Sequence, residues 1–84
     1  MTEYIAIISQ SYFVWNEELG KYTVTYLFAD MGFETKTYRV ARIQRRDDNM
    51  SYRNIVLAYE ITSDGDLIIY SDEAFTGKIK LIAG

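Results

Sequence analysis

The chain has 84 residues, of which 49% are hydrophobic, 15% aromatic and 25% charged, and its formal net charge is −3. This composition is typical of a folded globular domain and not of a disordered segment. The sequence contains no cysteine and no histidine. Their absence excludes disulfides, thiolate nucleophiles, cysteine metal sites and the commonest general base.

The first segment, YIAIIS (residues 4–9), predicts a strand with a short apolar run. This run is too short for the apolar region of a signal peptide. No stretch of the sequence approaches the roughly 18 apolar residues of a membrane helix. We therefore expect a soluble cytoplasmic protein without a membrane partner, in a bacterial cytosol or in the cytosol of an infected host.

Four bulky apolar residues follow one another in the next segment: Tyr12, Phe13, Val14 and Trp15. In a strand, successive side chains point to opposite faces, so two of the four face away from the core. Exposed aromatic side chains near arginines are typical of protein interfaces. Phe13 and Trp15 are therefore candidate partner-binding residues. The alternative is a strand buried on both sides within a sandwich.

Residues 21–30 (KYTVTYLFAD) alternate between two faces and predict a strand. The segment DMGF (30–33) predicts a tight turn at Gly32, after which the chain returns as a second strand over residues 34–44. The apolar parity of that return strand changes near residues 40–41. This change predicts a β-bulge or a bend into a second sheet.

Residues 54–61 and 67–70 predict a second hairpin with its turn at Asp64-Gly65. Both strands are nearly continuously apolar, so we expect this hairpin to be the most buried part. EAFTG (73–77) predicts a turn or a single helical turn, and KIKLIA (78–83) predicts the last strand.

Together these elements predict one small antiparallel all-β domain over residues 1–84. It would have about six strands, arranged as an open barrel or a two-sheet sandwich. The alternative is a helix within residues 38–60, which would place Arg39, Arg42 and Arg46 on one helical face.

Every arginine of the chain lies in RVARIQRRDDNMSYR, residues 39–53. Residues 33–46 carry a net charge of +4, whereas the segments on both sides are acidic. The arginine guanidinium matches carboxylates and phosphates and stacks on rings. The candidate partner-binding residues of this segment are Arg39, Arg42, Arg45, Arg46 and Arg53, with Tyr38 and Tyr52 at its ends.

Known catalytic patterns are absent from the sequence. The glycines are scattered and there is no Ser-x-x-Lys motif. The carboxylate pairs read as turn residues, and an EF-hand-like loop would need oxygen ligands where the chain has Ile68 and Tyr70. We therefore predict no enzyme activity, no cofactor and no metal.

The first hypothesis is a small non-enzymatic protein that binds a macromolecular partner stoichiometrically. That partner would be a protein, and the chain would be an inhibitor or adaptor of the kind encoded by phages or mobile elements.

The second interpretation is single-stranded nucleic-acid binding through the same arginines and tyrosines. The low pI of 4.8 counts against it. In its length and in a GKY strand before a tight hairpin, the chain loosely resembles the small tyrosine-rich single-strand-binding proteins of filamentous phages. No specific motif aligns, and no family is assigned. The third interpretation is a structural or oligomeric subunit, such as a homodimer.

Overall fold

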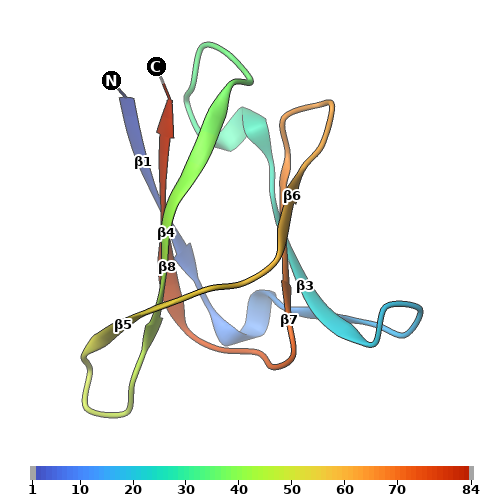
Figure 1. The fold of residues 1–84 in the computed structure, drawn as a ribbon, viewed down its shortest axis with the longest axis vertical. Coiled ribbons are helices and arrows are strands. Elements are labelled where there is room, and N and C mark those ends of the chain that lie inside the picture. The colour runs from blue at the N-terminus through green and yellow to red at the C-terminus, as the bar shows by residue number, and fades with distance from the viewer. Residues whose placement is uncertain (1, 84) are drawn as a thin grey trace.

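The computed structural model describes residues 2–83, which form two antiparallel four-stranded sheets (Figure 1). The first sheet has the order β1-β8-β4-β5 and the second β2-β3-β7-β6. The first sheet contains β1 (Thr2–Ile8), β8 (Gly77–Ala83), β4 (Tyr38–Arg46) and β5 (Tyr52–Ile55). The second contains β2 (Val14–Asn16), β3 (Lys21–Tyr26), β7 (Leu67–Ser71) and β6 (Tyr59–Ile61). The all-β prediction is confirmed, and residues 2–83 form two sheets with eight strands instead of the six expected.

The core lies between the sheets and takes every second residue of the central strands. In β8 the buried Ile79 and Leu81 alternate with half-buried Lys78 and Lys80, because successive side chains of a strand point to opposite faces. The buried hydrophobic residues are Ala6, Ile8, Val24, Met31, Phe33, Tyr38, Ile43, Leu67, Ile69, Phe75, Ile79, Leu81 and Ala83.

The predicted hairpin between residues 21–30 and 34–44 is wrong. β3 pairs with β2 and β7, whereas β4 pairs with β8 and β5 in the other sheet. Between them the chain passes through a 3₁₀ turn, η2 (Phe28–Asp30), and crosses from one sheet to the other. Met31 and Phe33 are buried in the core, so this segment is a packed crossover and not a tight turn.

The predicted change of phase near residues 40–41 is a β-bulge. The pairing of β4 with β8 shifts between Val40 and Arg42, which leaves Ala41 as the extra residue. The helix considered for residues 38–60 is wrong, because β4 and β5 form an antiparallel hairpin there.

The predicted strand over residues 54–61 is divided between the sheets. β5 belongs to the first sheet and β6 to the second, with residues 56–58 crossing between them. β6 and β7 form the predicted hairpin, and Gly65 in its turn adopts a φ of 88°. β7 is buried as expected, but β6 is an edge strand, and Val56 in the crossing is 98% exposed.

The helical turn considered for residues 73–77 does not form. This segment is a loop that leads from β7 into β8, and Phe75 within it is buried in the core. A short 3₁₀ turn instead forms at η1 (Gln10–Tyr12), just after β1.

Candidate functional site

The bulge in β4 brings three arginines to one face of the first sheet. Arg39 lies opposite Ile82, and Arg42 lies opposite Lys80, although an unbroken strand would place these two arginines on opposite faces. The extra residue Ala41 shifts the alternation of side chains by one position, so that Arg39 and Arg42 lie on the same face. Arg39, Arg42 and Arg46 therefore all point away from the second sheet.

The neighbouring strand β8 adds two lysines to the same face. Lys80 pairs with Arg42, and Lys78 pairs with Gln44, so both lie on the outer side of the sheet. β1 adds Ile5 beside Lys80 and Ile7 beside Lys78. We call this surface the basic face; it consists of Glu3, Ile5, Ile7, Arg39, Arg42, Gln44, Arg46, Tyr52, Asn54, Lys78, Lys80 and Ile82.

The basic face carries five cations and a single acid, Glu3, and so has a formal charge of +4. The rest of the chain then carries −7. Lys80 pairs with Glu3 at 3.1 Å. Within residues 2–83, the other four cations of the face make no ion pair with a carboxylate. A strong positive field on one side of an acidic molecule favours oriented docking.

Like charges lie directly opposite each other on this face. Arg42 and Lys80 are cross-strand partners, an arrangement that costs on the order of 0.2–1 kcal/mol. Lys78 is partly compensated, because its ammonium lies 4.2 Å from the ring centroid of Tyr52. Such a cation–π contact contributes about 0.5–1 kcal/mol at an exposed site. The face therefore retains uncompensated positive charge in the folded protein.

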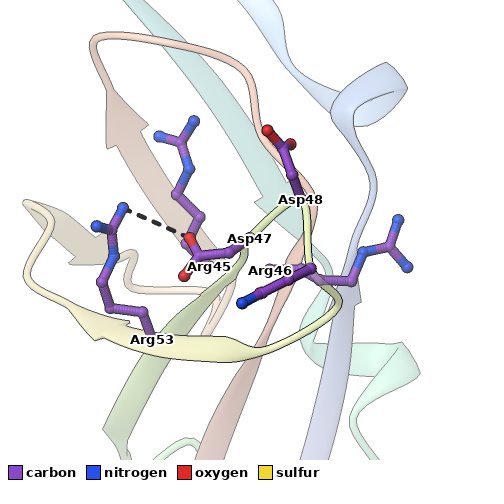
Figure 2. Close-up of a pocket in the computed structure, with 6 residues that line it drawn as sticks. Arg45, Arg46, Asp47, Asp48 and Arg53 are labelled. Carbon is purple, nitrogen blue, oxygen red and sulfur yellow. Dashed lines mark ion pairs between the residues drawn. The ribbon is translucent and has the colours of Figure 1, made fainter.

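Arg45 and Arg53 lie on the opposite side of the same hairpin. They are cross-strand partners, and each forms an ion pair with a carboxylate of this chain. Arg45 forms an ion pair with Glu73, and its Cζ lies 5.7 Å from the centroid of the Phe75 ring. Arg53 lies 3.8 Å from Asp47. Figure 2 shows these two arginines on one side, with Arg46 pointing away from them.

An open hollow of about 490 Å³ lies at this end of the hairpin. Its lining mixes three arginines with the acidic turn, so its charges are largely balanced. The lining residues are Arg45, Arg46, Asp47, Asp48, Asn49 and Arg53.

Tyr38 lies in the core and is not part of the candidate surface. Its hydroxyl donates a hydrogen bond of 2.6 Å to the carbonyl oxygen of Gly65, and its ring packs against Phe28 and Phe33. Burial raises the pKa of this hydroxyl, and the Asp66 carboxylate adds to the rise. Of the two tyrosines that flank the arginines in sequence, only Tyr52 remains on the surface, where it is 44% exposed.

Phe13 and Trp15 belong to a different surface. The ring centroids of Phe13 and Phe75 are 5.2 Å apart. The half-exposed Trp15 packs against Tyr22 in the second sheet, with 5.0 Å between their ring centroids. Phe75 also lies beneath Arg45. Phe13 and Arg45 therefore both contact the Phe75 ring. Neither Phe13 nor Trp15 lies on the basic face.

The contribution of β1 and β8 to the basic face was not predicted from the sequence. The alternation in KIKLIA places Lys78 and Lys80 on one side of a strand, which was a usable signal. The pairing of that strand with β4, far away in sequence, carries no local signal. Ile5 and Ile7 lie in the predicted strand over residues 4–9, and the sequence did not indicate which face of the sheet they occupy.

Within residues 2–83, no three acidic side chains gather as they would around a metal ion. Neither 3₁₀ turn of the described chain has the length or apolarity of a membrane-crossing helix. Comparisons with protein-family models, curated proteins and solved structures found no match to this chain.

Proposed function

We propose that this protein is a small non-enzymatic binding protein that docks stoichiometrically on an acidic surface of a protein partner through the basic face. One observation carries the proposal: five cations share one sheet face with a single acid, while the rest of the chain is strongly acidic. Opposed like charges destabilise the free protein. Carboxylates of a partner would remove that cost on binding.

A protein partner fits the basic face better than a nucleic acid. Single-stranded nucleic acids bind to grooves where several aromatic rings stack on successive bases. Here Tyr52 is the aromatic residue of the face, and Lys78 already lies over its ring. Ile5 and Ile7 are 44% and 59% exposed beside the lysines. Apolar side chains mixed with arginine are typical of protein interfaces.

Nucleic-acid binding is the second candidate, because five cations on one face are enough to displace counterions from a phosphate backbone. Binding of that kind weakens steeply with salt and needs no apolar contact.

The test is affinity capture from a lysate of the natural host, with and without nuclease, using three tagged proteins. These are the parent chain, Arg42→Glu/Arg46→Glu on the basic face, and Lys21→Glu/Lys36→Glu outside it. The two double variants change the net charge equally. We expect a specific protein to be captured by the parent and by the lysine variant, and lost by roughly 100-fold with the arginine variant.

Two outcomes would contradict the proposal. Capture that persists in the Arg42→Glu/Arg46→Glu variant would show that the basic face is not the contact surface. Capture that disappears with nuclease would favour the nucleic-acid candidate.

A further inference from the structure

The basic face is organised in columns along the strands. β1 contributes the exposed Ile5 and Ile7, and β8 contributes Lys80 and Lys78 beside them. β4 contributes the arginine column, in which Arg42 lies beside Lys80. From β1 to β4 the surface therefore changes from apolar to cationic over about two strand spacings, or roughly 10 Å.

These dimensions match an α-helix lying along β8. A helix with its side chains is about 10–12 Å wide. Residues of the same column in a strand repeat about every 6.7 Å, and helix residues four apart repeat about every 6 Å. The mismatch over two turns is small enough for flexible lysine and arginine side chains to absorb.

An extended peptide would fit this surface less well. Laid across a sheet face, its backbone N–H and C=O groups would lose water without gaining partners, which is costly. A helix satisfies its own backbone, and helices commonly pack on sheet faces as a second layer.

We propose that the basic face receives an amphipathic acidic α-helix of the protein partner. Its apolar stripe would lie on Ile5 and Ile7, and its carboxylates would face the cations of β8 and β4. This inference rests on the proposed function and adds the structural class of the partner segment. Charge complementarity with a face of +4 requires the acidic side of the helix.

The test uses defined probes of about 15 residues, or four helical turns. One peptide has glutamate and leucine in two adjacent helical stripes, and a second is its scrambled isomer with the same composition. Polyglutamate and oligothymidylate of similar charge complete the set. Binding is measured by fluorescence anisotropy at low ionic strength, and helix formation by circular dichroism. We expect the striped peptide to bind at least tenfold more tightly than its isomer and to gain helicity.

Two variants separate the apolar and electrostatic contributions. Ile5→Thr/Ile7→Thr keeps β-branched residues in β1 and should reduce binding of the striped peptide to the level of its isomer. The same variant should leave polyglutamate binding unchanged. Arg42→Glu/Arg46→Glu should abolish binding of every acidic probe. Lys21→Glu/Lys36→Glu, which carries the same charge change outside the face, should retain the preference.

The outcomes distinguish this inference from the proposed function. Equal binding of the striped and scrambled peptides would contradict the helical partner segment but not the proposed function. The same conclusion would follow if neither peptide bound while the host partner was still captured through Arg42 and Arg46. Tighter binding of oligothymidylate than of any peptide would overturn both in favour of nucleic acid.

Discussion

Arg45 and Arg46 are adjacent in sequence and occupy opposite sides of one strand. Arg45 is cross-strand to Arg53, pairs with Glu73 and lies over Phe75. Arg46 lies on the outer face, opposite Tyr52. The charge of Arg45 is thus neutralised by an ion pair within the protein, whereas Arg46 adds to the positive charge of the basic face. Residue type alone does not identify a binding site, because neighbours from distant strands decide whether its charge is compensated.

The two tyrosines at the ends of the arginine segment differ in the same way. Tyr38 is buried and bonded to the Gly65 carbonyl, whereas Tyr52 lies on the basic face under Lys78. Of the two tyrosines expected to stack on bases, one is therefore available on the surface. This favours a protein partner over a nucleic acid.

The greatest loss of stability is expected at Gly77, where β8 pairs with the arginine-bearing strand β4. Gly77 is buried opposite Arg45, and a Cβ there would overlap the Gln44 carbonyl oxygen. We expect Gly77→Ala to lower the free energy of unfolding by about 3 kcal/mol or more, because β4 and β8 must separate. Urea denaturation measures this.

The matched control is Gly20→Ala, where a Cβ meets no atom within 4 Å and only the positive φ opposes alanine. It should cost about 1 kcal/mol. Equal costs at the two positions would contradict the close approach of the strands at Gly77.

The hydroxyl groups of the two tyrosines should also differ in their contribution to stability. Tyr38→Phe removes the hydrogen bond to the Gly65 carbonyl and should cost about 1–2 kcal/mol in chemical denaturation. Tyr52→Phe keeps its ring beneath Lys78 and should change stability by less than about 0.5 kcal/mol. A surface role for Tyr38 would be indicated if the two variants were equally stable.

The pH dependence of stability gives a second measurement on Tyr38→Phe. Burial raises the pKa of the Tyr38 hydroxyl in the folded state, and a tyrosine in the unfolded chain titrates near 10. Above that pH the unfolded state binds fewer protons, so stability should fall as pH rises. The fall should be shallower in Tyr38→Phe; an unchanged slope would contradict the burial of this hydroxyl.

A smaller effect is expected at the paired arginine. Arg45 and Glu73 form a partly exposed ion pair, and such pairs contribute about 0–1 kcal/mol. A double-mutant cycle with Arg45→Ala and Glu73→Ala should give a coupling energy in that range. Neither change should reduce capture of the partner. Loss of capture on Arg45→Ala would place the contact surface on the paired side of the hairpin.

A gain in stability, opposite in sign to the changes above, is expected on the basic face. Arg42→Thr removes one of two opposed cations and should raise the free energy of unfolding by about 0.2–1 kcal/mol while weakening partner binding. Arg39→Thr is the control, because Arg39 faces Ile82 across the strands. Arg39→Thr should weaken partner binding without raising the free energy of unfolding. A similar gain in both variants would point to strand propensity instead of charge.

Most of the strands, the change of phase near residues 40–41 and the turn at Asp64-Gly65 could be predicted from the sequence. Each depends on local periodicity or on the backbone freedom of glycine. The crossovers could not, because the apolar residues of 31–33 and 54–58 suit a turn or a continuous strand equally well on local grounds. Only burial of Met31 and Phe33 between the sheets shows that the chain changes sheet there.

For the candidate site, the concentration of the arginines in one segment and the acidity of its flanks follow from the sequence. Which cations share a face of the sheet depends on the tertiary structure. Cross-strand pairing brings Lys78 and Lys80 beside β4 from the far end of the chain and places Lys80 opposite Arg42. The loop between β7 and β8 supplies Glu73, the acid that pairs with Arg45. The physical reason is that strand periodicity fixes the side of a residue, whereas its neighbours depend on long-range pairing that local sequence does not encode.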